Sequence, residues 1–152
     1  MKFNFKISAI ISLSVLLLSC TSDPKRKENQ RISEIMNNTE YKNQIQEIEL
    51  LEKSMTEYMD FAEPSYTEKD IEKCKSILIE FIQNIDKTSN REEGLKIVQS
   101  TILELNELNK KCDFDLIETN EREQIAGIII GAGNQKGYNT LSEGITEEWR
   151  EW

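Results

Sequence analysis

The side chains that can do chemistry in this sequence are three cysteines and a large set of carboxylates. The cysteines are Cys20, Cys74 and Cys112, the acidic residues number 28, and there is no histidine. The nucleophilic triads that use histidine and the commonest zinc sites are therefore excluded. Paired carboxylates can still do acid–base chemistry. Residues 118–123 contain three carboxylates, those of Glu118, Glu121 and Glu123. In so acidic a chain most such pairs lie on solvated faces, so we assign no catalytic residue and no metal site.

Cys20 follows a segment that is typical of exported proteins. Lys2 and Lys6 precede residues 7–18, which are apolar apart from three serines. A bilayer-spanning helix needs about 20 apolar residues, so this run is too short to span. Its length and its basic flank instead match the hydrophobic region of a secretory signal.

The sequence Leu17-Leu18-Ser19-Cys20 at the end of this segment resembles the lipobox of bacterial lipoproteins. The resemblance rests on a leucine three residues before the cysteine and a small residue directly before it. It implies cleavage after Ser19, a diacylglycerol thioether on Cys20, and a further chain such as palmitate on its amine. Two or more chains give stable anchoring. The alternatives are an ordinary secretory signal with an incidental cysteine and an uncleaved anchor.

We therefore expect a signal peptide at 1–19, a lipidated Cys20 with a polar tether over 20–38, and a helical domain at 39–152. Thr21 stands where an aspartate would retain a lipoprotein in the inner membrane. In a Gram-negative host this favours the outer membrane. The membrane is thus one expected partner, and the lipid on Cys20 is the only expected attached group.

The charge of the chain restricts its other partners. The net charge is −9, and residues 1–19 carry two lysines and no acid, so cleavage would leave −11. Nucleic-acid binding requires basic patches and is excluded. A basic protein would be steered toward such a surface, although acidity also serves solubility alone.

Apolar residues recur at three- and four-residue intervals along most of the remaining chain, which predicts helices. Four amphipathic helices with short connections predict an all-α fold, an antiparallel four-helix bundle with a short C-terminal helix. The third helix is apolar over the widest arc, so we expect it to be central. The expected helices cover residues 40–62, 67–87, 91–111, 120 to 133 or 137, and 146–152.

Two of these helices begin with recognisable caps. Thr67 with Asp70, and Asn120 with Glu123, have the spacing of a capping box. Residues 128–137 read as an apolar run followed by Gly-Ala-Gly and a later glycine. A dinucleotide-binding fingerprint would need a strand before it and a helix after it, so we interpret this stretch as a helix C-terminus.

Cys74 and Cys112 form a candidate disulfide, because an exported protein can oxidise them. In a helical hairpin that turns near Ser89, however, their heights differ by about 10 Å at 1.5 Å per residue. A disulfide requires Cα atoms within about 7 Å. The alternative for Cys74 is a buried core position.

The C-terminal segment carries the candidate partner-binding residues. Trp149 and Trp152 either staple the segment onto the bundle or anchor a partner, since tryptophan is enriched in binding hot spots. The exposed rim around them would consist of Glu147, Glu148 and Glu151.

Residues 105–152 also resemble a family of small, uncharacterised helical bacterial proteins. The resemblance rests on Leu105 to Cys112, Leu116-Ile117-Glu118-Thr119, Arg122-Glu123 and residues 145–152. It implies no activity. It suggests that Arg122, Glu123, Trp149 and Arg150 form one assembly at an end of the bundle, which a salt-bridged structural closure would also explain.

The leading functional hypothesis is a lipid-anchored, non-catalytic protein-binding module, of immunity or inhibitor type, for a basic partner. One alternative is a carboxylate-dependent hydrolase with a cleft near residues 118–123. Two buried, converging acids in that cleft would favour it. The other is a carrier of a small apolar ligand, which requires a cavity between the third and fourth helices.

Overall fold

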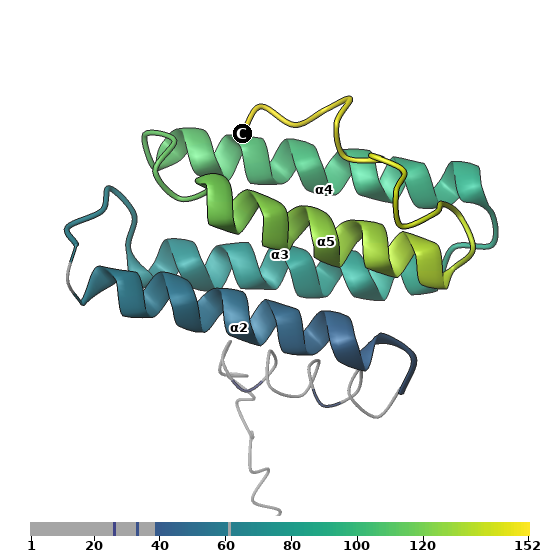
Figure 1. Cartoon of the computed structure of the whole chain (residues 1–152), viewed down its shortest axis with the longest axis horizontal. Coiled ribbons are helices and arrows are strands. Elements are labelled where there is room, and N and C mark those ends of the chain that lie inside the picture. Colours follow the sequence, from purple (N-terminus) through teal and green to yellow (C-terminus); the bar gives the residue numbers. More distant parts are fainter. Residues whose placement is uncertain (1–25, 27–32, 34–38, 61) are drawn as a thin grey trace, which may run out of the picture.

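The computed structural model describes residues 26, 33, 39–60 and 62–152. The expected signal peptide, the lipidation of Cys20 and nearly all of the tether lie outside the described residues. The described part contains one short 3-10 helix and four α-helices and no strand, which confirms the all-α helical bundle (Figure 1). The elements are η1 (Thr39–Tyr41), α2 (Lys42–Met59), α3 (Glu68–Asp86), α4 (Arg91–Lys111) and α5 (Thr119–Gln135). None of these helices has both the length and the apolar character that crossing a membrane requires.

Helix α3, rather than α4, is the central element of the bundle. It packs against both α2 and α4, and α2 packs in turn against α5. The seven apolar residues that predicted its buried face are all buried: Ile71, Cys74, Ile77, Leu78, Phe81, Ile82 and Ile85. The expectation that the third helix would be central was wrong, because part of its apolar arc faces solvent, where Leu103 is 48% exposed.

Helix α2 buries a narrower stripe than its sequence suggests. Ile45, Ile48, Leu51 and Met55 are buried, and Leu50, which lies off this stripe, is exposed. Tyr58 continues the apolar spacing of the helix but is 42% exposed. In the last turn only Met59 packs against the core, and it is partly buried.

The caps at the helix starts are partly as predicted. Thr67 and Asp70 form a capping box, in which the Thr67 amide donates to the Asp70 carboxylate at 3.0 Å. The predicted cap at Asn120 was wrong, because α5 begins two residues earlier with Glu118 as its cap. The cause is tertiary: Ile117 is buried, and its amide donates to the buried Asn109 side chain at 2.9 Å, so the helix must begin directly after it.

Helix α5 ends at the glycine-rich stretch, as the sequence predicts. Gly137 has φ +72, and the amides of Gly137 and Tyr138 donate to the carbonyls of Asn134 and Gly133 at 2.8 and 2.9 Å. These bonds define a Schellman motif, in which glycine takes the left-handed position without strain.

The predicted short helix at 146–152 is wrong, because this segment forms turns and coil along α4 (Figure 1). The buried side chain of Asn106 on α4 explains the difference. Its amide donates to the Trp149 carbonyl at 2.8 Å and its oxygen accepts from the Glu151 amide at 3.2 Å. Asn106 thus takes the Glu151 amide, which a helix would pair with the Glu147 carbonyl, and binds the Trp149 carbonyl as well.

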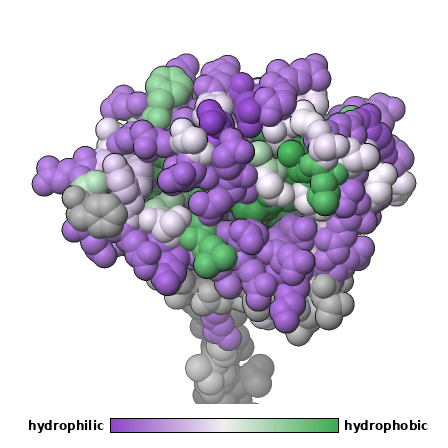
Figure 2. Space-filling model, viewed as in Figure 1, coloured by the Kyte–Doolittle hydropathy of each residue, from purple (hydrophilic) through white to green (hydrophobic). Residues whose placement is uncertain are grey.

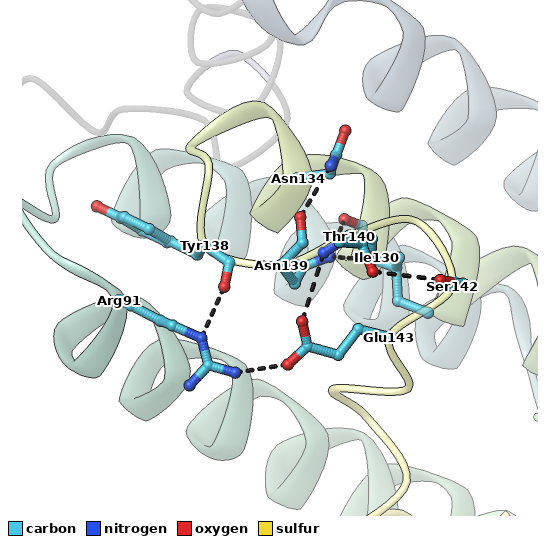
Figure 3. Close-up of polar contacts among 8 residues, drawn as sticks. All are labelled: Arg91, Ile130, Asn134, Tyr138, Asn139, Thr140, Ser142 and Glu143. Atoms are coloured by element: carbon cyan, nitrogen blue, oxygen red, sulfur yellow. Dashed lines mark hydrogen bonds and ion pairs between the residues drawn. The ribbon is translucent and has the colours of Figure 1, made fainter.

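A polar network fixes the chain between α5 and this segment, as Figure 3 shows. The Asn139 amide group donates to the carbonyls of Ile130 and Thr140 at 3.1 and 2.9 Å. From the start of α4, Arg91 donates to the Tyr138 carbonyl at 2.7 Å and to the Glu143 carboxylate at 2.6 Å. The return of the chain over α4 is therefore specified by hydrogen bonds as well as by apolar packing.

Candidate binding groove

The most distinctive surface of the described chain is a groove at one end of the bundle. The end of α2, the loop before α3, the α4–α5 connection, the start of α5 and the C-terminus meet there, at the left of Figure 1. We call this feature the aromatic groove; its volume is about 390 Å³. Its lining residues are Tyr58, Tyr66, Phe114, Asp115, Ile117, Glu118, Thr119, Asn120, Glu121, Arg122 and Trp152.

A second, shallower hollow continues the aromatic groove along α2 and α5. It shares Tyr58, Asn120 and Glu121 with the groove and has a volume of about 460 Å³. The further residues that line it are Ser54, Glu57, Glu123 and Gln124. The two hollows are therefore neighbours, and the second adds the acids Glu57 and Glu123 beside the aromatic groove.

Four aromatic side chains line the groove to different depths. Tyr66 is buried, and its hydroxyl donates to the Met55 carbonyl at 3.4 Å. Tyr58 and Phe114 are 42% and 55% exposed, and Trp152 is half-buried. Burial, together with the nearby carboxylates of Glu121 and Asp115, raises the pKa of Tyr66 to about 12. These two carboxylates also line the groove beside the four aromatic residues.

Phe114 is held in the groove by an unusual backbone. Asp113 and Phe114 have φ of 53 and 64, and the Phe114 amide donates to the Asn109 carbonyl at 2.8 Å. This arrangement ends α4 as Gly137 ends α5, but without glycine. A bulky residue in this region is an outlier, and each such residue costs about 1–3 kcal/mol. Residues 112–116 lie between two expected helices, and no signal in the sequence marks Phe114.

The carboxylates of the groove are engaged by the backbone rather than by cations. Asp115 accepts from the Ser65 amide at 2.6 Å, and Glu121 accepts from the Glu118 amide at 3.2 Å. Between described residues, no ion pair includes Asp115, Glu118 or Glu121. Arg122, the one basic residue in the lining, pairs with Glu123 at 3.3 Å. The lining therefore carries a surplus of negative charge.

This geometry does not favour the hydrolase alternative. The groove near residues 118–123 exists, but Glu118 is exposed and Asp115 and Glu121 are only half-buried. A carboxylic acid that acts as a proton donor at neutral pH needs a buried or like-charged environment that raises its pKa. These carboxylates instead cap backbone amides. Among the described residues no group of three or more acids, cysteines or histidines is arranged to hold a metal ion.

The carrier alternative, which requires a cavity between the third and fourth helices, is also not favoured. The side chains that α4 and α5 direct into the interior, Ile102, Leu105, Ile125 and Ile129, are all fully buried within one apolar core. Close packing leaves such an interior without room for a ligand.

The candidate partner-binding residues of the C-terminal segment lie partly in the groove. Trp149 and Trp152 are half-buried and pack against the core, as the staple interpretation requires, and Trp152 also lines the groove. The predicted acidic rim is exposed at Glu147, Glu148 and Glu151.

The suggested assembly of Arg122, Glu123, Trp149 and Arg150 is not one ion-paired unit. Arg122 pairs with its neighbour Glu123, and Arg150 pairs with Glu147 at 2.6 Å within its own segment. The Arg150 guanidinium also lies 5.7 Å from the centre of the Trp152 ring.

Cys74 and Cys112 are free thiols in the structure, and both are buried. The candidate disulfide is therefore not formed, and Cys74 is a core residue of α3, which was the alternative. Burial raises the pKa of Cys74 to about 12 and also raises that of Cys112, so both thiols remain protonated at neutral pH.

No protein-family model, no curated protein and no solved structure matches this chain. The resemblance of residues 105–152 to helical bacterial proteins, like that of the leader to lipoproteins, therefore remains a prediction.

Proposed function

We propose that this chain is a lipid-anchored protein of the bacterial cell envelope whose helical domain binds another protein without catalysing a reaction. The partner is basic, and the mode is that of an immunity protein or inhibitor. The anchor is Cys20, and the outer membrane is the expected location. The sequence of the leader supports the anchor, and the aromatic groove supports the binding role.

The observation that carries the binding role is the composition of the groove. Four aromatic side chains and three acids line it, and the one base among them is paired with Glu123. Tryptophan and tyrosine are enriched among the few residues that dominate binding at protein interfaces, and charge of one sign steers a partner of the other. Polar side chains dominate the face shown in Figure 2, where apolar ones form separate small patches. A groove of this kind fits a salt-sensitive interaction better than a large apolar interface.

The anchor is tested by metabolic labelling with palmitate. Wild-type chain should incorporate label and float with outer membranes on a density gradient, whereas Cys20→Ser should do neither. Cys112→Ser is the matched control, because it removes a buried thiol of the helical domain and should keep the label. Equal fractionation of wild type and Cys20→Ser would overturn the anchor.

The binding role is tested by capture from envelope extract on the immobilised full chain. A specific basic protein should bind at low salt and elute by 0.5 M salt, at which the screening length is only about 4–5 Å. If the captured protein is a toxin or hydrolase, adding the chain should reduce its activity. Failure to recover any salt-sensitive protein would count against the proposal.

A further inference from the structure

We propose that the aromatic groove recognises an arginine side chain on a basic segment of the partner protein, with the exposed ring of Phe114 as the stacking surface. This inference rests on the proposed function, because it names the site and the chemical group that a protein partner would present. It concerns a surface depression whose lining residues come from five separate parts of the described chain.

The sign of the electrostatic potential in the groove follows from its side chains rather than from the helix dipoles. The carboxyl ends of α2 and α4 and the amino ends of α3 and α5 meet at this end of the bundle. Their helix dipoles oppose one another, and the amino end of α5 is already occupied by Glu118 and Glu121. Asp115, Glu118 and Glu121 therefore determine the potential in the groove, and Glu57 and Glu123 extend it into the adjoining hollow.

The aromatic residues select a cation that is flat and weakly hydrated. A guanidinium stacks on aromatic faces and also donates two parallel hydrogen bonds to a carboxylate, whereas an ammonium is a compact, strongly hydrated charge. The chain itself contains this contact, since Arg150 lies over the Trp152 ring at 5.7 Å. Because Arg150 already occupies Trp152, a partner's arginine would make the same type of contact with the exposed ring of Phe114.

The backbone at Phe114 supports a role in recognition. The aromatic ring is 55% exposed although residues 113 and 114 are both in the left-handed region. An exposed side chain contributes little to the core, so it does not compensate for an unfavourable backbone. Strain that is retained at such a position is typical of binding sites.

The experiment titrates the full chain in detergent with the peptide Ac-Gly-Arg-Leu-Arg-Gly-NH2 and with its lysine and citrulline analogues. The chain carries Trp149→Phe, so that Trp152 is the one tryptophan and reports on the groove. The arginine peptide should bind about tenfold more tightly than the citrulline peptide, the factor expected for a partly desolvated cation on an aromatic face. Raising the salt from 0.05 to 0.5 M should remove most of this preference.

The decisive variant is Phe114→Gly, which removes the ring and relieves the backbone. It should weaken binding of the arginine peptide about fivefold and raise the urea midpoint of unfolding. A purely structural residue would not move these two readouts in opposite directions. Glu118→Gln with Glu121→Gln removes two of the three carboxylates in the groove lining. It should reduce the salt dependence, and Asp115 should retain the remainder. Leu103→Ala and Glu107→Gln, both exposed on α4, are the matched controls and should bind as wild type.

Several results would overturn the inference. The arginine site would be refuted if the citrulline peptide bound as tightly as the arginine peptide. It would also be refuted if Phe114→Gly bound the arginine peptide as tightly as wild type does. Tighter binding of tetramethylammonium would indicate a small quaternary amine, and self-association that Phe114→Gly abolishes would indicate a second copy of the chain. If a captured partner binds both groove variants normally, the inference fails while the proposed function stands. If the peptide binds as expected but no partner is captured, the proposed function fails alone.

Discussion

Alanine should have opposite effects at two glycines of α5, Gly127 and Gly133. A Cβ atom at Gly127 would meet nothing within 4 Å, so Gly127→Ala gains helix propensity at no steric cost. A Cβ atom at Gly133 would overlap the Asn139 side-chain oxygen and come within 3.2 Å of Ile145. The same substitution six residues further along one helix therefore tests the close approach of the C-terminal chain to α5.

The magnitudes follow from the contacts. Gly127→Ala should stabilise by about 0.5–1 kcal/mol. Gly133→Ala must displace Asn139, whose side chain donates to Ile130 and Thr140. Each bond contributes about 1 kcal/mol, and poor packing at Ile145 adds about 1 kcal/mol. After the propensity gain of about 1 kcal/mol, Gly133→Ala should destabilise by about 2 kcal/mol.

The assay is urea unfolding followed by circular dichroism, with wild type and both variants measured in parallel. The two variants should differ by about 3 kcal/mol in free energy of unfolding, with unchanged slopes against urea. The fluorescence of the tryptophans should be unchanged in Gly127→Ala. If Gly133→Ala stabilised the protein as much as Gly127→Ala does, the packing of residues 139–145 against α5 would be refuted.

Three further substitutions test other contacts. Lys111 and Thr67 hold the pKa of Asp70 below its usual value, so its stabilisation is present above about pH 4 and lost as the pH falls through the folded pKa. Asp70→Asn should lower the free energy of unfolding at pH 7 by about 1–2 kcal/mol. It should also make the urea midpoint of unfolding less dependent on pH between pH 5 and 2. The same pH dependence in the variant as in wild type would refute this. Asp113→Gly should stabilise the protein by about 1 kcal/mol. A lower unfolding temperature in this variant would contradict the left-handed backbone at residue 113. Asn106→Ala should destabilise by about 2 kcal/mol and shift tryptophan emission to the red, whereas unchanged emission would mean that the C-terminal segment does not depend on this side chain.

Much of the bundle was predictable because helix faces are encoded locally. The spacing of Ile71, Leu78 and Ile85 predicted the buried face of α3, and the pair Thr67 and Asp70 predicted its start. Gly137 likewise predicted the end of α5. These signals act between residues that are close together in the sequence, so they hold whatever the helix packs against.

The groove was not predictable in the same way. Residues 118–123 were recognised as a carboxylate-rich stretch and Trp152 as a candidate anchor, but nothing in the sequence joined them to Tyr58, Tyr66 and Phe114. The apolar period of α2 continues through Tyr58, and by itself that period would place Tyr58 on the buried face. Its exposure depends on where α2 ends relative to its neighbours, which is a property of packing.

The sequence by itself determined that the chain is helical, acidic and without histidine, and it determined the inner face of α3. Only the tertiary structure decided that α3 is central, that α5 begins at Thr119, and that the last residues do not form a helix. The reason is physical: a local pattern specifies which face of a helix avoids water, but Asn106 and Asn109 fix the chain through hydrogen bonds to residues 8 to 45 positions away. Such bonds depend on which surfaces meet, and this is settled only when the whole core has packed.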